Sequence, residues 1–153
     1  MIEVLNNLDE NTANSILEVQ IPAYQVEAKI IEFDGIPALK DTIETIKTTK
    51  ETFIGYKIEK ELVGFLSYSK SNDEFQICRL VVHPNYFRRG IAKKIINYFI
   101  AQIVKNSKVI VSTGKKNLPA ITLYKSFNFR IVKDIEVAPM IFITYLEKNG
   151  MMD

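Results

Sequence analysis

The sequence has a single cysteine, Cys78, among its 153 residues, so no disulfide can form within the chain. One free thiol fits a reducing compartment. The chain also lacks any apolar run approaching the ~20 residues of a membrane span, and no basic region precedes an apolar stretch at the N-terminus. We therefore expect no signal peptide, no membrane contact and a soluble, cytoplasmic protein.

Charge of one sign is also scarce. The 20 Lys and Arg residues stand against 18 Asp and Glu residues, which gives a net charge of +2. Nucleic acid and anionic membranes attract strongly basic surfaces, so neither is expected as a partner, and any basic patch must be local. Hydrophobic residues make up 47% of the chain, enough for a sizeable core. We expect one domain over residues 1–153.

Periodicity and turn residues divide the chain into helices and strands. Strands are predicted at Ile2–Leu5, Thr52–Ile58, Leu62–Ser69, Glu74–Val82, Lys108–Ser112, Phe129–Val137 and Met140–Glu147. Helices are predicted at Asn11–Gln20, Pro22–Glu32, Leu39–Thr49, Gly90–Val104 and Leu118–Ser126, with Pro22 breaking the first and opening the second. Helices lie between strands, but three strands run consecutively. This order predicts an α/β fold, in its mixed α+β form, around one central sheet.

The clearest chemical pattern runs from Leu80 to Ala92, where a strand leads through a turn into a helix. Gly90 stands where the helix begins, and Ala92 follows it. The first N–H groups of a helix have no internal partner and can surround a phosphate, provided that side chains leave room. Arg88 and Arg89 add positive charge at the rim. The alternative interpretation is an ordinary strand-turn-helix with a solvated arginine pair.

A second pattern runs from Asn117 to Phe129. Asn117 can cap a helix that has Pro119 in its first turn, and Tyr124 falls late in that helix. Asn128 stands where a helix must often end with a positive φ, which Asn tolerates better than most residues. The alternatives are a plain helix cap for Asn117 and a core aromatic for Tyr124.

Both patterns resemble motifs of the GNAT-type N-acetyltransferases. Residues Phe87 to Ala92 are similar to the family signature Q/R-x-x-G-x-G/A, with Phe87 in place of the polar first residue. Residues Asn117 to Phe129 are similar to the motif N-x-x-A-x-x-L-Y-x-x-x-G-F, with Asn128 in place of its glycine. The resemblance covers about residues 52–145. It implies a single domain with a central, mostly antiparallel mixed sheet of six to seven strands flanked by helices.

The resemblance also implies an activity: direct transfer of an acetyl group from acetyl-CoA, a co-substrate, to a primary amine of a small molecule or peptide, without a metal. The pantetheine arm would pair with the strand backbone near Leu80 and Val82, and Tyr124 would act as general acid toward the leaving sulfur. The residues implied in coenzyme A binding are Leu80, Val81, Val82, Phe87, Arg88, Arg89, Gly90, Ile91, Ala92, Asn117 and Tyr124.

The general base stays open between Glu74, His83 and water. Gln76 and Cys78 are expected to share the inward parity of Leu80, but neither is an evident base, and Cys78 is best explained as a buried structural thiol.

For the acceptor amine, Tyr24, Glu27, Phe33 and Asp34 are candidate lining residues, and solvated surface charge is the alternative for the two acids. The chain can also be a non-catalytic acyl-CoA-binding or regulatory module on the same fold. A homodimer is one option for the oligomeric state, which the sequence leaves open.

Overall fold

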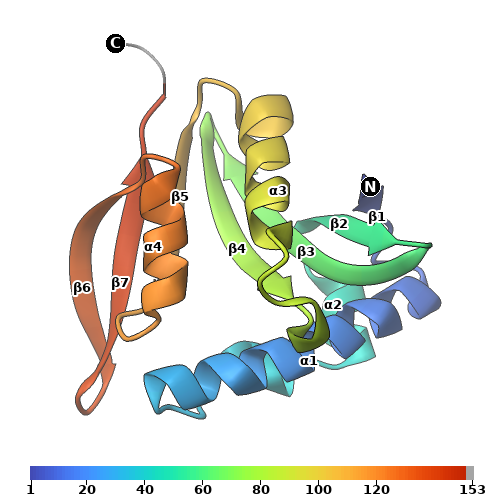
Figure 1. The fold of residues 1–153 in the computed structure, drawn as a ribbon, viewed down its shortest axis with the longest axis horizontal. Helices are drawn as coiled ribbons and strands as arrows, with labels where there is room; N and C mark the ends of the chain where they lie inside the picture. Colours follow the sequence, from blue (N-terminus) through green and yellow to red (C-terminus); the bar gives the residue numbers. More distant parts are fainter. Residues whose placement is uncertain (151–153) are drawn as a thin grey trace.

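The computed structural model describes residues 1–150 as a seven-stranded sheet with helices on both faces (Figure 1). The strands are β1 (Ile2–Leu5), β2 (Thr52–Ile58), β3 (Glu61–Ser71), β4 (Glu74–Val82), β5 (Lys108–Gly114), β6 (Arg130–Ala138) and β7 (Ile141–Lys148). The helices are α1 (Glu10–Ile31), α2 (Ile43–Thr48), α3 (Ile91–Tyr98) and α4 (Leu118–Ser126), together with the 3-10 turns η1 (Pro37–Lys40) and η2 (Pro84–Tyr86) and the π-helical turn η3 (Phe99–Val104), which continues α3. The predicted fold class is confirmed.

The sheet has the strand order β1-β2-β3-β4-β5-β7-β6. All neighbouring strands are antiparallel except β4 and β5, which are parallel. The β4–β5 ladder has only three residue pairs, from Glu74 opposite Lys108 to Gln76 opposite Ile110. Beyond these pairs the two strands separate, as Figure 1 shows. The sheet is therefore open at its centre.

Two apolar clusters hold the helices on the sheet. α1 and α2 pack on one face, where Ile16 and Ile46 are fully buried, and α3 and α4 pack on the other, where Phe99 is fully buried. Neighbouring residues of one strand serve opposite clusters, as Phe53 and Ile54 of β2 do. This follows from the two-residue period of a strand. No helix within residues 1–150 is both long and apolar enough to cross a membrane.

α1 continues through Pro22, so the prediction of two helices is wrong. Proline removes one backbone hydrogen bond and costs about 3 kcal/mol relative to alanine inside a helix. Val19 and Ala23, on either side of Pro22, are both buried in the same apolar cluster. Continuous burial of this face outweighs the lost hydrogen bond.

The predicted helix over Leu39–Thr49 is divided in two. η1 ends at Lys40, Asp41 and Thr42 are extended, and α2 then begins at Ile43. Thr42 and Thr45 cap α2 reciprocally: the Thr42 hydroxyl accepts from the Thr45 N–H at 3.3 Å, and the Thr45 hydroxyl accepts from the Thr42 N–H at 2.8 Å. A helix start therefore lies inside the stretch that the apolar spacing had joined.

A β-bulge in β4 changes which side chains face which side. Ser67 of β3 pairs with Arg79, and the next residue, Tyr68, pairs with Ile77, so Cys78 is the extra residue. Side-chain alternation reverses across it. The expectation that Gln76 and Cys78 share the inward parity of Leu80 is therefore wrong: Ile77, not Gln76, packs in the cluster that Leu80 contacts.

Replacing Pro22 by alanine should stabilise the protein, because it restores a backbone N–H in the interior of α1. We expect the free energy of unfolding to rise by about 1 kcal/mol, which is less than the full helix propensity difference because alanine also loosens the unfolded chain. The matched control is Pro119→Ala, since Pro119 lies in the first turn of α4, where an N–H has no helical partner. Urea denaturation measures both. A less stable Pro22→Ala variant would contradict our explanation of α1.

Candidate active site

The opening between β4 and β5 leads into a cavity of about 1150 Å³. Its walls come from α1, the loop that follows α1, β4, the start of α3, β5 and α4. The predicted coenzyme A residues that line it are Leu80, Val81, Val82, Phe87, Arg88, Gly90, Ile91, Ala92, Asn117 and Tyr124. Arg89 instead stacks on Tyr86, with its guanidinium carbon 4.9 Å from the ring centroid. The fold thus brings the two sequence patterns to one cavity.

Gly90 forms the N-terminal end of α3 in a left-handed conformation, with φ 74° and ψ 16°. Arg88, two residues earlier, also has a positive φ of 64°. A Cβ atom added at Gly90 would meet no described atom within 4 Å, apart from its chain neighbours, so there is open space beside this residue. The glycine is needed for its backbone angle and leaves a hollow at the free N–H groups. These features fit an anionic phosphate.

The backbone of β4 turns hydrogen-bonding groups toward the opening. The N–H of His83 donates to the carbonyl of Val63 in β3 at 2.8 Å. Hydrogen-bonding direction alternates along an antiparallel strand, so Val81 also faces β3, whereas Leu80 and Val82 face away from it. On that side β5 is no longer paired with β4. Leu80 and Val82 therefore offer a free strand edge to an extended ligand.

Asn117 serves as a helix cap and also lines the cavity. Its side-chain oxygen accepts from the N–H of Ala120 at 3.3 Å, and its amide nitrogen donates to the hydroxyl of Thr113 at 3.3 Å. The residue is only 7% exposed. Its orientation is thus fixed from both α4 and β5 before any ligand binds.

Tyr124 is 4% exposed, and its ring packs against Phe129 with centroids 5.3 Å apart. Its hydroxyl neither donates nor accepts a hydrogen bond within residues 1–150. Burial raises the pKa of Tyr124, and the negative charge of Glu27 raises it further. The phenol is therefore protonated at neutral pH and has a proton to give.

The base candidates from the sequence lie outside the lining of this cavity. Glu74 is the first residue of β4, at the end of the strand that is far from Gly90. One of its carboxylate oxygens lies 3.7 Å from the ammonium of Lys108. His83 accepts through Nδ1 from the N–H of Asn85 at 3.1 Å, which stabilises the turn after β4. Cys78 does line the cavity, but burial raises the pKa of its thiol, which disfavours the thiolate.

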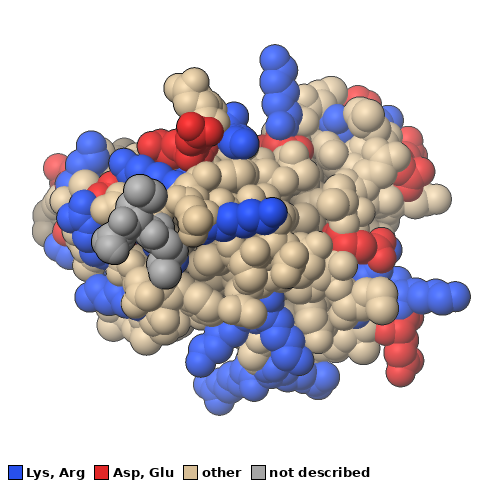
Figure 2. All heavy atoms as spheres, turned by 90° about the horizontal axis from the view of Figure 1, so that it is seen from above, with Lys and Arg blue, Asp and Glu red and all other residues tan. Residues whose placement is uncertain are grey.

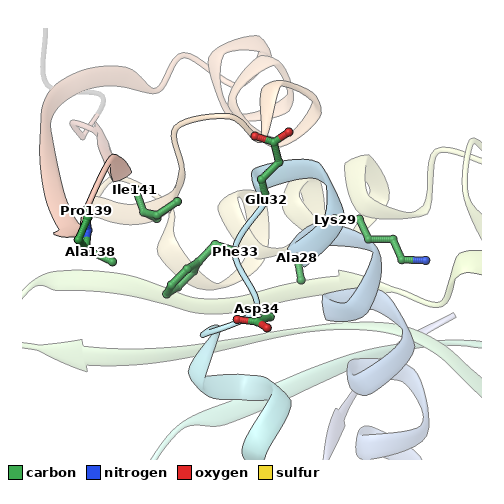
Figure 3. A pocket seen from close by; sticks show the side chains of 8 residues that line it. All are labelled: Ala28, Lys29, Glu32, Phe33, Asp34, Ala138, Pro139 and Ile141. Carbon is green, nitrogen blue, oxygen red and sulfur yellow. The ribbon is translucent and has the colours of Figure 1, made fainter.

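Of the acceptor candidates, Tyr24, Glu27 and Phe33 line the main cavity. Asp34 lies beside it, in an open hollow of about 530 Å³ between the end of α1 and the turn that joins β6 and β7. Figure 3 shows the Phe33 side chain extending from the loop after α1 toward that turn, where Ala138 and Ile141 lie. Phe33 and Ile141 line both, so the hollow and the cavity are adjacent.

A network of ion pairs lies at the α1 end of the cavity, where the acceptor candidates Tyr24 and Glu27 are found, and the sequence analysis did not predict it. This end is called the acceptor end below. The guanidinium of Arg79, in β4, lies 3.0 Å from a carboxylate oxygen of Asp41 and 3.0 Å from one of Glu51. It also donates to the side-chain oxygen of Gln20 in α1 at 2.8 Å, and Gln20 in turn donates to Asp41 at 2.7 Å. Ser67 donates to Glu51 at 2.6 Å. The network ties α1 and the segment after η1 to the centre of the sheet.

Figure 2 shows that Lys and Arg side chains gather at the lower edge of the view, whereas acidic side chains lie elsewhere on the same face. Other Lys and Arg side chains stand beside acidic ones over the rest of this face, so the group at the lower edge is one basic patch on a surface of mixed charge. Within the cavity the charge is also divided. Arg88 and Lys93 line the end at α3, and Glu27, Asp41 and Glu51 line the end at α1.

The described residues form a seven-stranded mixed α/β sheet that parts at its parallel pair, β4 and β5, with the N-terminus of a helix beside the gap. Comparison with known families identifies the family. Residues 14–129 match the model of the acetyltransferase (GNAT) family. The chain belongs to the GNAT acetyltransferase family, which confirms the predicted family and the enzyme class that it defines.

The chain is also similar to known proteins in sequence or in fold. The chain is 41% identical over 138 residues to the UPF0157 protein YqkA of Bacillus subtilis, and the match covers 90% of this chain but 40% of that protein. The ribosomal-protein-S18-alanine N-acetyltransferase of Escherichia coli has a similar fold, with a TM-score of 0.78 at 14% identity, covering 100% of this chain and 95% of that one. The paiA N-acetyltransferase of Thermoplasma acidophilum, solved with coenzyme A, has a TM-score of 0.71 at 15% identity, covering 97% and 99%.

Removing the charge of Arg79 should strongly destabilise the fold, because two carboxylates that are 16% and 19% exposed would lose their cation. We expect Arg79→Met to lower the free energy of unfolding by about 3 kcal/mol in urea denaturation. Arg130→Met is the control, since Arg130 pairs with Glu147 at the edge of the sheet and is 66% exposed. It should cost no more than about 0.5 kcal/mol. An equal loss of unfolding free energy in the two variants would contradict a structural role for the network.

Proposed function

We propose that the chain transfers an acetyl group from acetyl-CoA to a primary amine. The observation that carries the proposal is the continuity of one cavity, which joins the open N-terminus of α3 at Gly90 to the free edge of β4 and to Tyr124. Each part meets one need of the reaction: a site for phosphate, a site for an extended arm and a proton donor near the end of that arm.

The N–H groups at the start of α3 bind the pyrophosphate in this proposal. They are free of protein contacts in front of Gly90, and Arg88 and Lys93 line the same end of the cavity. The free backbone edge at Leu80 and Val82 then pairs with the pantetheine arm in the way that an added strand would. Phe87 replaces a polar residue of the family signature, but the main-chain groups do not depend on that side chain.

Tyr124 supplies the proton that the leaving sulfur needs. Its protonated state follows from burial, and its free hydroxyl faces the cavity that holds the thioester in this proposal. The free N–H groups of β4 near Leu80 and Val82 stabilise negative charge on the thioester oxygen. Holding donor and acceptor together in one cavity supplies much of the remaining acceleration.

The first test is binding. Acetyl-CoA should raise the melting temperature of the protein in a concentration-dependent way, since a ligand that binds only the folded state stabilises it. Gly90→Val should weaken binding at least about 10-fold by titration calorimetry, because its branched side chain fills the hollow and strains the positive φ. Gly90→Asn separates the two effects, since asparagine tolerates this backbone angle. Unchanged affinity in both variants would place the phosphates elsewhere.

The second test is turnover. Thiol release from acetyl-CoA should depend on an added amine; the panel is lysine, kanamycin and a hexapeptide with N-terminal alanine. Tyr124→Phe should lower kcat by about 10²-fold and leave acetyl-CoA affinity within about 2-fold. Tyr98→Phe is the control, because Tyr98 lies in α3 away from the cavity lining. Binding of acetyl-CoA without thiol release for any amine would favour the non-catalytic acyl-CoA-binding module instead.

A further inference from the structure

Among residues 1–150, three carboxylates line the cavity, and one of these three has no cation beside it. Asp41 and Glu51 are both bound by Arg79. Glu27 forms no ion pair and accepts no hydrogen bond from any other group within residues 1–150. No side-chain oxygen that is sealed from solvent within residues 1–150 lacks a hydrogen-bond partner, so the unpaired oxygens of Glu27 are open to a ligand that enters the cavity.

Glu27 sits where α1 faces the cavity. Tyr24, Glu27 and Ile31 recur at intervals of three and four residues, and all of them line it. Tyr124 lines it from α4, and the charge of Glu27 raises the pKa of both Tyr24 and Tyr124. The carboxylate of Glu27 and the proposed general acid Tyr124 therefore line the same cavity and interact electrostatically there.

We propose that Glu27 is the catalytic residue that binds the ammonium group of the acceptor and removes its proton. This rests on the proposed function and assigns the base that function needs. It also assigns a substrate class: amines that arrive as cations. The acceptor end holds three carboxylates against one arginine, so it attracts a cation, while Arg88 and Lys93 line the opposite end.

The protons balance in this scheme. Glu27 takes one proton from the ammonium, and the neutral nitrogen forms a bond to the thioester carbon. The carbon–sulfur bond then breaks as Tyr124 gives its proton to the sulfur. The nitrogen, now part of the amide, loses a second proton, which returns to the Tyr124 phenolate through solvent. Glu27 releases its proton to water, so the products are the N-acetyl amine, the free thiol and one proton.

Burial supports Glu27 in this role, because it raises the pKa of the carboxyl toward the range useful to a base. The titratable and charged groups around it in the cavity are Tyr24, Cys78, Arg79, Tyr124, Asp41 and Glu51. Burial raises the pKa of both tyrosines and of the thiol, so none of these three loses its proton at acid pH. Arg79 holds Asp41 and Glu51, and this network is unchanged in a Glu27 variant.

The experiment compares Glu27→Gln and Glu27→Asp with the wild type, using whichever amine of the panel above gives the highest turnover. Glu18→Gln is the matched control, an exposed acid on the same helix outside the cavity lining. The measurements are kcat/KM for the amine from pH 5 to 10, acetyl-CoA affinity by titration calorimetry and the melting temperature at pH 7.

We expect Glu27→Gln to lower kcat/KM at pH 7 at least about 100-fold and to leave acetyl-CoA affinity within about 2-fold. In this variant the rate should rise tenfold per pH unit toward the pKa of the amine, because solution must now deprotonate the acceptor. Glu27→Asp should keep the acidic limb of the wild-type profile. The raised pKa of Glu27 means that its ionisation weakens the fold as pH rises, so Glu27→Gln should melt no lower than the wild type at pH 7.

A Glu27→Gln variant that keeps wild-type kcat/KM and the same pH profile would overturn the assignment of the base. So would an equal loss in Glu18→Gln, or a loss that follows a fall in melting temperature. These outcomes differ from failure of the proposed function, in which the wild type itself releases no thiol with any amine.

Discussion

The early end of the β4–β5 ladder is the constraint on which the site depends. After the pair of Gln76 and Ile110, β5 continues beside β7 and β4 continues beside β3 alone. A free edge in the middle of a sheet leaves amide groups without partners, which proteins normally avoid or cover. Here α1 lines the gap from one face and α4 from the other. The gap is therefore a lined cavity, and its unpaired backbone is available to a ligand.

The limits of a strand or helix could be predicted where residues next to it in the sequence determine them. The bounds of β4 and α4 match the predictions, because Pro84 ends the one and Asn117 and Pro119 start the other. The bulge at Cys78 could not be found in this way, because it depends on the register with β3. The prediction that Pro22 ends a helix was wrong for a similar reason, because burial of α1 against the sheet outweighs the local preference of proline.

The same distinction applies to the site. The proposed phosphate end consists of main-chain groups and a glycine, so a local motif was enough to bring Gly90 and Leu80 into the prediction. The acceptor end consists of side chains that meet only in the folded chain. Arg79 contacts Gln20, Asp41 and Glu51, which are 59, 38 and 28 residues away. The one signal in the sequence is that Arg79 interrupts an apolar run, and this does not indicate which residues Arg79 contacts.

The two kinds of acid in the cavity follow from these contacts. Asp41 and Glu51 are held by a shared guanidinium and by neutral donors, so they fix the wall that joins α1 to the sheet. Their carboxylate oxygens are therefore engaged in contacts within the fold. Glu27 has no such partner within residues 1–150, and burial disfavours its ionised form. Arg79 offsets only one of these two negative charges, so the wall keeps a net negative charge beside the unpaired carboxylate of Glu27, which also acts electrostatically on Tyr124. That arrangement stabilises a bound cation more than it stabilises the empty protein, and it explains why an acid that weakens the fold is present in the cavity.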